Sequence, residues 1–332
     1  MNSFEYIRPA TIAEAIAASA QSNAAFLAGG TNLLDLMKGG VACPSRLVDI
    51  SRLPGLDQIE IMADGTIRMG ALVRNSDLAY HPEISKRLPI VAEALLSGAS
   101  AQLRNAATIA GNVMQRTRCA YFYDPASACN KRLPGSGCDA KGGDTRLAAI
   151  LGWSEHCIAV NPSDFCVPMV ALDTVVEIAG PQGSREVPLE DFQLLPGETP
   201  ERETLLAPGE MIVALRVAPQ AASFAGHARY LKVRDRTSYA FAIVSVAAAL
   251  RLDGGTITEA RIALGGVALK PWRAREAFAR AADAALSDAR PSGDNGFKIE
   301  LARRLIIRTL NEAARGTPRP LPALPASVVN AA

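Results

Sequence analysis

The stretch FLAGGTNLL, Phe26 to Leu34, is the point from which the organisation of this 332-residue chain can be read. An apolar segment, Ala24 to Ala28, runs into a Gly-Gly-Thr-Asn turn, and the apolar start of a helix follows. A strand that breaks at two glycines before a helix turns backbone N–H groups into one concavity, which suits an anionic phosphate. The stretch contains neither GxGxxG nor GxxxxGK(S/T), the dinucleotide and P-loop fingerprints. Taken alone, it is more typical of an ordinary strand–turn–helix connection.

The composition is that of a globular protein without a dominant charge. Hydrophobic residues make up 49% and charged residues 20%, and 35 basic against 33 acidic side chains leave a net charge of +2. This balance argues against a nucleic-acid or membrane-surface partner. The N-terminal MNSFEYIRPATIAEA lacks the basic and apolar regions of a signal peptide, and no apolar run long enough for a membrane span occurs. We expect a chain without membrane insertion, in the cytoplasm unless a signal-bearing partner exports it.

The chain is long for one hydrophobic core, so more than one domain is expected. Strand and helix patterns alternate at its start, where Thr11 and Glu14 form a capping box before an alanine-rich helix. PQAAS, Pro219 to Ser223, is interpreted as a linker. A strand pair joined at Gly254-Gly255 follows it, together with helices predicted over Trp272–Ala285 and Phe297–Ala314. These patterns predict two domains, residues 1–221 and 222–332, with the tail from residue 317 extended over the surface.

The segment TIAGN, Thr108 to Asn112, consists of small residues that leave little room for packing. Such a segment in the middle of a domain indicates either that a ligand fills the space or that two elements cross closely. The sequence alone leaves both interpretations open.

Cysteines are concentrated in one long segment, residues 116–160, that has little hydrophobic periodicity and therefore needs an organising element. Four of them are separated by 9, 8 and 18 residues. Thiolates are soft ligands for iron–sulfur clusters, zinc or copper(I), but the paired C-x-x-C knuckles of structural zinc sites are missing. The spacing favours a 4Fe–4S cluster, with zinc or two disulfides as alternatives. The proposed ligands are Cys119, Cys129, Cys138 and Cys157.

The remaining cysteines, Cys43 and Cys166, are interpreted as buried thiols outside this ligand set. Arg116 and Arg118 flank the cysteine-bearing segment. They are interpreted either as charges that act on the cluster or its partner, or as surface residues.

Four motifs, taken together and in their order along the chain, resemble those of a known protein family. They are FLAGGTNLLDLMK, RNAATIAGNV, NPSDF with PMVALD, and YLKVRDRTSYAFAIVSVAAAL. Together they resemble the FAD-binding (medium) subunits of the molybdenum hydroxylases, the family of xanthine dehydrogenase, aldehyde oxidoreductase and carbon monoxide dehydrogenase. Within it, the chain looks most like flavin subunits of bacterial periplasmic aromatic-aldehyde oxidoreductases. The cysteine segment resembles that of the 4-hydroxybenzoyl-CoA reductase branch, which carries an extra 4Fe–4S cluster.

The resemblance implies a fold class and a set of FAD contacts. The fold would be α/β (α+β), with a two-subdomain FAD-binding unit of the vanillyl-alcohol-oxidase type and a smaller α/β C-terminal domain. Asp164 would accept hydrogen bonds from adenosine or ribityl hydroxyls, and Lys232 would stabilise negative charge on the reduced flavin ring. Thr108, Gly111 and Asn112 would line the second phosphate and the ribitol. The pyrophosphate would lie against Phe26, Leu27, Ala28, Gly29, Gly30, Thr31, Asn32, Leu33 and Leu34.

The function implied is that of an electron-transfer flavoprotein subunit in a heterotrimer. Electrons would pass from a molybdenum-bearing large subunit, through 2Fe–2S clusters of a small subunit, to FAD on this chain and on to an external acceptor. The histidines are scattered and no nucleophile–base constellation occurs, so no catalytic residue is predicted here. The resemblance also favours a periplasmic location by co-export. Two alternatives remain, a zinc- or disulfide-stabilised interaction subunit without redox function and a stand-alone flavin oxidase.

Overall fold

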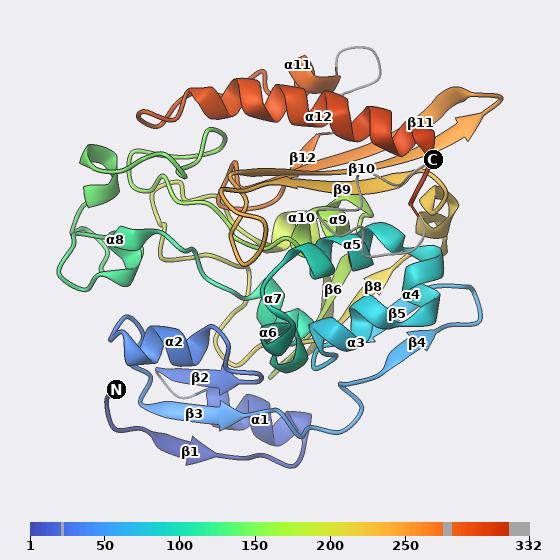
Figure 1. Cartoon of the computed structure of the whole chain (residues 1–332). Coiled ribbons are helices and arrows are strands. Elements are labelled where there is room, and N and C mark those ends of the chain that lie inside the picture. Colours follow the sequence, from blue (N-terminus) through green and yellow to red (C-terminus); the bar gives the residue numbers. More distant parts are fainter. Residues whose placement is uncertain (21–22, 275–280, 319–332) are drawn as a thin grey trace.

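A parallel sheet opens the chain in this computed structural model, which describes residues 1–20, 23–274 and 281–318 (Figure 1). Its strand order is β1-β3-β2, and two helices make the connections. The strand–turn–helix predicted at FLAGGTNLL is confirmed as β2, the turn and α2. The bounds of these elements are β1 Glu5–Ile7, α1 Ile12–Ser19, β2 Ala24–Leu27, α2 Leu33–Lys38 and β3 Arg46–Asp49.

Helix α1 begins where the capping pattern predicts. The Thr11 side chain accepts a hydrogen bond from the Glu14 N–H at 3.2 Å. The Glu14 carboxylate accepts from the N–H of Ala10 at 2.8 Å, one residue before the position that a capping box leads us to expect. The first bond satisfies a donor that the first helical turn leaves without a partner, and the second ties the residue before the N-cap to the helix.

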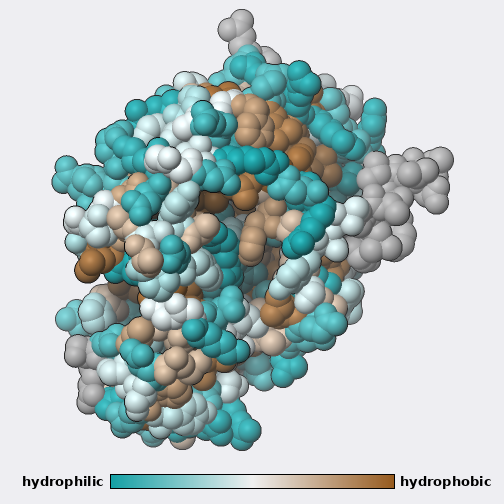
Figure 2. All heavy atoms as spheres, turned by 60° about the vertical axis from the view of Figure 1, so that its left-hand side comes forward, coloured by the Kyte–Doolittle hydropathy of each residue, from teal (hydrophilic) through white to brown (hydrophobic). Residues whose placement is uncertain are grey.

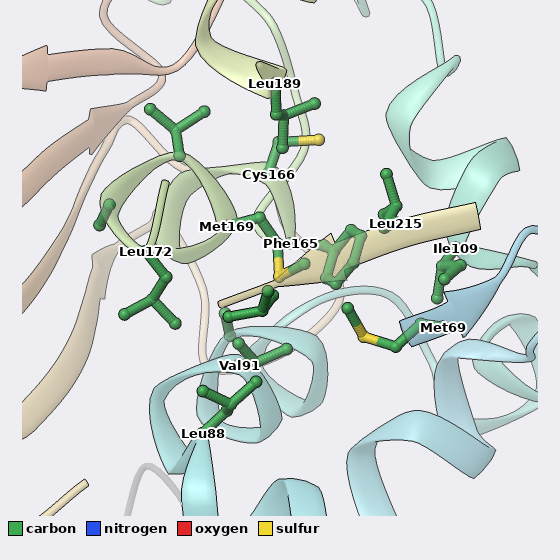
Figure 3. Close-up of a cluster of buried hydrophobic side chains, with 14 of the residues drawn as sticks. Met69, Leu88, Val91, Ile109, Phe165, Cys166, Met169, Leu172, Leu189 and Leu215 are labelled. Carbon is green, nitrogen blue, oxygen red and sulfur yellow. The ribbon is translucent and has the colours of Figure 1, made fainter. Parts of the chain in front are cut away.

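The second sheet is antiparallel, with the order β4-β5-β8-β6-β7. Figure 3 shows its core, where Met69 and Leu215 from the sheet face Val91 and Phe165 from the neighbouring segments. The helices α3 to α7 follow β5 and α9 precedes β6. The bounds are β4 Ile59–Ile61, β5 Ile67–Gly70, α3 Asn75–Tyr80, α4 Pro82–Arg87, α5 Pro89–Ser97, α6 Ala101–Ala106, α7 Ile109–Val113, α9 Cys166–Ala171, β6 Val175–Gly180, β7 Gly183–Pro188, α10 Leu189–Phe192 and β8 Met211–Val217.

Between α7 and α9 the chain runs through a long segment with little regular structure, as the sequence predicts. Only the helix α8, Ala120–Tyr123, and a single 3₁₀ turn, Asp139–Gly142, interrupt its turns and bends. In Figure 1 this segment projects at one side of the molecule around α8.

The third sheet is antiparallel, with the order β12-β11-β10-β9. Helix α12 lies along one face of this sheet, whereas α5 and α9 contact its other face (Figure 1). The buried positions of α12 recur at helical spacing, which gives it one apolar stripe toward the sheet. The bounds are β9 Ala228–Val233, β10 Val244–Asp253, β11 Thr256–Gly265, β12 Trp272–Ala274, α11 Ala281–Ala285 and α12 Phe297–Arg315.

One sequence prediction in this half is wrong at its start. The helix predicted over Trp272–Ala285 begins instead as the strand β12, because Trp272 to Ala274 pair with the edge of β11; residues 275–280 lie outside the described chain, and its end forms α11. The PQAAS stretch is part of a 3₁₀ helix, Pro219–Phe224, whose Ala221 and Phe224 are buried, and its role as a linker stays a prediction. The tail from residue 319 lies outside the described residues. The division after residue 221 stays a prediction.

In the described residues, no helix has both the length and the apolar character needed to cross a membrane.

A buried lysine fastens the end of the cysteine-bearing segment to α12. The Lys298 Nζ donates to the carbonyl oxygens of Gly266 at 2.7 Å, Ala148 at 2.8 Å and Leu147 at 3.3 Å, and its side chain is fully buried. Asn295, also fully buried, donates to the carbonyls of residues 148 and 149. These bonds hold a stretch of turns and bends that belongs to no sheet.

Burial lowers the pKa of Lys298 from its ordinary value to about 7, and the nearby Arg146 charge lowers it further. Between pH 7 and 10 the unfolded chain therefore binds more protons at this lysine than the folded chain. The unfavourable contribution of Lys298 to the unfolding free energy therefore shrinks as the pH rises. We expect the unfolding free energy of the unsubstituted protein, minus that of Lys298→Met, to rise with pH by up to about 1.4 kcal/mol per unit. Urea unfolding across this pH range measures the difference, and a difference that stays constant with pH would contradict the prediction.

Candidate functional site

A cavity of about 700 Å³ lies among segments from both halves of the chain. Its wall combines the turn after β2, the helices α5 to α7, the start of the cysteine-bearing segment, and the stretch after β9. Figure 2 shows this side of the molecule hollowed near its middle, with hydrophilic and hydrophobic residues at the opening. Its volume is within the usual range for a site that binds a small molecule or cofactor, about 300–1,000 Å³.

The structure brings six of the predicted FAD contacts together on this wall, from four separate parts of the sequence. They are Thr31, Asn32, Gly111, Asn112, Asp164 and Lys232. The other predicted contacts do not line the cavity; they lie in β2, at the turn after it, in the first turn of α2 or at the N-cap of α7. These are Phe26, Leu27, Ala28, Gly29, Gly30, Leu33, Leu34 and Thr108. Their role as direct FAD contacts stays a prediction.

The two glycines of the turn are needed for the protein's own packing. A Cβ on Gly29 would lie 2.0 Å from the carbonyl oxygen of Ala106 at the end of α6. Gly30 has a φ of +71°, and a Cβ there would lie 2.8 Å from the Leu34 Cδ1. The first glycine thus lets α6 approach the turn, and the second lets the chain reverse into α2. Both shape the cavity wall.

TIAGN forms a close helical turn that contributes to the wall, so both interpretations of its small residues have support. Thr108 caps α7 by accepting a hydrogen bond from the Gly111 N–H at 3.2 Å. The Asn112 carboxamide oxygen accepts from Ser163 Oγ at 2.7 Å, which ties α7 to the NPSDF motif. The segment therefore makes a close contact with the NPSDF motif and also lines the large cavity.

A buried polar network lies on the opposite wall. The Asp164 carboxylate accepts from the Tyr230 hydroxyl at 2.5 Å and from Lys232 Nζ at 2.7 Å. Lys232 also donates to the carbonyl of Ser97 at 3.3 Å. The Lys232 side chain is only 4% exposed, so it is not the solvated strand residue that an isolated lysine in a strand suggests.

Among the cavity residues that were not predicted as FAD contacts are Arg104, Arg118 and Tyr123. The Arg118 guanidinium donates to the Tyr123 hydroxyl and lies 5.3 Å from the centre of the Phe241 ring, whereas its buried Nε has no hydrogen-bond partner. Asn32 Nδ2 donates to the same hydroxyl at 3.3 Å. The only sequence signal for Arg118 was its place directly before Cys119. Its companion Arg116 instead pairs with Glu203.

The four predicted metal ligands line a second, much smaller cavity of about 10 Å³. Cys129 and Cys138 face each other across an isolated antiparallel bridge, and the wall is otherwise mainly apolar. All six cysteines of the chain are free thiols. Among the residues described, no group of three or more His, Cys, Asp or Glu side chains is arranged to hold a metal ion. The structure therefore gathers Cys119, Cys129, Cys138 and Cys157 without displaying a formed metal site.

Burial decides the protonation of these thiols. It raises the pKa of Cys119 and Cys138, and raises that of Cys157 to about 11. The neighbouring Lys131 acts in the opposite direction on Cys157. A metal would have to displace the thiol protons, because thiolates and not thiols are the ligands.

One short segment separates the two cavities. Thr117 and Cys119 line the cysteine cavity, and Arg118, between them, lines the large one. The same change of side occurs between Phe122 and Tyr123 in α8. Residues 117–123 thus form a partition that is a single chain thick.

The cysteines outside the cluster have different surroundings. Cys166 is fully buried, as predicted, and Figure 3 shows it within the apolar core beside Leu189. Cys43 is exposed, so the prediction that it is buried is wrong. It follows the end of α2 in an irregular stretch, where Val41 is buried but Cys43 is not.

The large cavity fits a flavin dinucleotide in size and in chemistry. It offers arginines for an anionic pyrophosphate, an apolar stretch for a ring, and a buried acceptor, the Asn75 Oδ1, that has no donor in the protein. The cysteine cavity matches a 4Fe–4S cluster only in the type and number of its donors; its volume is about 10 Å³, and its described side chains form no group arranged to hold a metal ion.

Comparisons with known proteins show a family match over most of the chain. Residues 2–220 match the family described as FAD binding domain in molybdopterin dehydrogenase, and residues 229–291 match the CO dehydrogenase flavoprotein C-terminal domain. The aldehyde oxidoreductase FAD-binding subunit PaoB of Escherichia coli is 50% identical over 94% of this chain and 99% of its own length. The carbon monoxide dehydrogenase medium chain of Hydrogenophaga pseudoflava is 31% identical over 93% and 96%.

The fold has the same relatives. A solved structure of carbon monoxide dehydrogenase from Hydrogenophaga pseudoflava, lacking the Mo-pyranopterin moiety of its cofactor, matches with a TM-score of 0.72 and 29% identity. The match covers 95% of this chain and 99% of that one. This confirms the predicted α/β class, with an FAD-binding unit followed by a smaller C-terminal domain. The chain belongs to the family of FAD-binding medium subunits of the molybdenum hydroxylases.

Proposed function

We propose that this chain is the electron-transferring flavin subunit of a molybdenum-dependent aldehyde oxidoreductase, with a 4Fe–4S cluster bound by Cys119, Cys129, Cys138 and Cys157. The aldehyde activity is supported by the 50% identity to a subunit named for it, over nearly the full length of both chains. The observation that carries the redox role is the pair of adjoining cavities, one sized for a flavin and one lined by four cysteines.

The role of the chain is to bind the cofactors, to orient them and to keep water away from them. FAD supplies the redox chemistry when it is bound, by accepting and releasing electrons. Asn32, Asn112 and Asn75 present amide groups to the large cavity, and Arg104 and Arg118 present cations to it. The apolar wall of the cysteine cavity keeps water away from the thiolates that would hold the cluster.

The proposal includes the partners of such an assembly. A large subunit with the molybdenum cofactor would oxidise the aldehyde, and a small subunit with 2Fe–2S clusters would pass the electrons to this chain. An external acceptor would take them from the flavin or from the 4Fe–4S cluster. No substrate chemistry is assigned to residues of this chain.

A visible spectrum with cofactor quantitation tests the proposal on the protein purified with its partners. We expect about one FAD and about four additional iron atoms per copy of this chain, beyond those of the 2Fe–2S clusters. Dithionite should bleach both the flavin bands and a broad iron–sulfur shoulder. A colourless protein with stoichiometric zinc would favour the non-redox interaction subunit. Aldehyde turnover by this chain alone would favour a stand-alone flavin oxidase.

We also propose that the complex is periplasmic and that this chain is exported with a signal-bearing partner. The support is the resemblance to flavin subunits of periplasmic aromatic-aldehyde oxidoreductases. Fractionation of the native host, with marker enzymes for each compartment, should recover the chain in the periplasm. Deletion of the small subunit should leave it in the cytoplasm. Recovery in the cytoplasm with all subunits present would contradict export.

A further inference from the structure

The carboxylate of Asp164 has both of its oxygen atoms engaged by the protein. Oδ1 accepts from the Tyr230 hydroxyl at 2.5 Å, and Oδ2 accepts from Lys232 Nζ at 2.7 Å. The Asp164 side chain is 10% exposed and that of Lys232 is 4% exposed. Both residues line the large cavity. The residue expected to bind cofactor hydroxyls is therefore already the buried partner of the residue expected to supply a positive charge.

Within the described chain, Asp164 is the acidic residue that pairs with Lys232. The other salt bridge at this cavity joins Asp235 to Arg146 at 2.7 Å, and these side chains are about half exposed, at 54% and 47%. Water and salt screen an exposed pair, whereas a buried pair acts on its surroundings through a lower effective dielectric. The field inside the cavity thus depends on Asp164 and Lys232 more than on the exposed pair.

Tyr230 completes the arrangement. Its ring is 2% exposed, and burial together with the Asp164 charge raises its pKa well above the ordinary value. It remains a neutral donor that disperses the carboxylate charge. Its strand, β9, also supplies Lys232 two residues on, so the two donors face the same side of the strand.

We propose that Asp164 is the counter-ion of Lys232 and a positioning residue for its ammonium group, so that the two residues shift the redox potential of the bound flavin in opposite directions. The inference rests on the proposed function, because it requires flavin in the large cavity. A cation beside the flavin favours the reduced, anionic form, and a carboxylate next to that cation offsets this effect. The pair sets the potential as a unit, and neither charge acts alone.

Redox titration of the flavin, followed by its absorbance in the protein purified with its partner subunits, tests this inference. FAD content is measured in parallel. Asp164→Asn should favour reduced over oxidised flavin by about tenfold or more, a rise of about 30 mV for a two-electron couple. Lys232→Met should lower the potential by a similar amount. Tyr230→Phe keeps both charges but removes a donor to the carboxylate, so it should lower the potential by less.

The matched control is Asp235→Asn, the same substitution on the same cavity wall in an exposed pair. It should shift the potential by much less than Asp164→Asn. A fall or no change in potential for an FAD-loaded Asp164→Asn protein overturns the inference. If that variant binds no FAD, the double variant Asp164→Asn/Lys232→Met decides. It should bind FAD at a potential near that of the unsubstituted protein, and loss of FAD there also overturns the inference.

The two proposals fail in different ways. Absence of FAD from the unsubstituted protein contradicts the proposed function. A flavin-loaded protein whose potential ignores Asp164 contradicts only the counter-ion assignment.

Discussion

Gly29→Ala is expected to deprive the protein of most of its bound FAD. The added Cβ would lie 2.0 Å from the Ala106 carbonyl oxygen and 2.8 Å from its carbon, and these are backbone atoms that cannot rotate away. Overpacking of this kind costs about 1–3 kcal/mol or more, and here it forces α6 away from the turn. We expect a destabilisation of about 3 kcal/mol and at least a tenfold fall in FAD per chain, measured by urea unfolding and by absorbance.

Gly226→Ala serves as the control, because a Cβ at Gly226 meets nothing within 4 Å and its φ is not in the left-handed region. It should keep both FAD and stability. Normal FAD content in a Gly29→Ala protein would show that α6 tolerates the shift, and that the contact with the turn does not shape the site.

Cys157→Ser is expected to remove most of the additional iron while FAD stays bound. Cys157 is 6% exposed and faces the small cavity, and a serine oxygen is a hard ligand that holds iron poorly in place of a thiolate. The residues that line the large cavity do not include Cys157, so the FAD contacts are kept. Iron and FAD determination on the purified complex measures both, with about four iron atoms per chain lost.

Two cysteine variants outside the cavity complete this experiment. Cys166→Ala alters a buried thiol of the core, and Cys43→Ser alters an exposed one, so both should keep their iron. Iron loss in Cys166→Ala would show that the ligand set is wrong. If the unsubstituted protein has no cluster iron and Cys157→Ser exposes one new reactive thiol, the cysteines form disulfides instead.

Much of the fold was predictable because the strands and helices follow their local patterns. Thr11 caps α1, the turn at Gly29 feeds α2, and the long cysteine-bearing segment has no periodic pattern and forms little regular structure. The failures involve partners far away in the sequence. Trp272 is in a strand because β11 offers an edge, and Ala221 of the PQAAS stretch is buried by elements that the local sequence does not reveal.

The site was predictable as a set of motifs but not as a set of contacts. Motif order identified Asn32, Asn112 and Lys232, which the fold does bring to one cavity. No local sequence pattern predicts that Arg118 lines that cavity while its neighbour Cys119 lines the cysteine cavity. The pairing of Asp164 with Lys232 joins residues 68 positions apart, so only the folded chain reveals it.

The large cavity also has a consequence for biosynthesis. Asn32 and Lys232 share its wall, although they lie 200 positions apart in the 332-residue sequence. Before β9 has been translated, the chain contains Asn32 but not Lys232, so the cavity wall is incomplete. Contacts between residues so far apart in the sequence are slow to form. Cofactor loading therefore has to wait until β9 has been translated, and a fragment ending before β9 should be isolated without flavin.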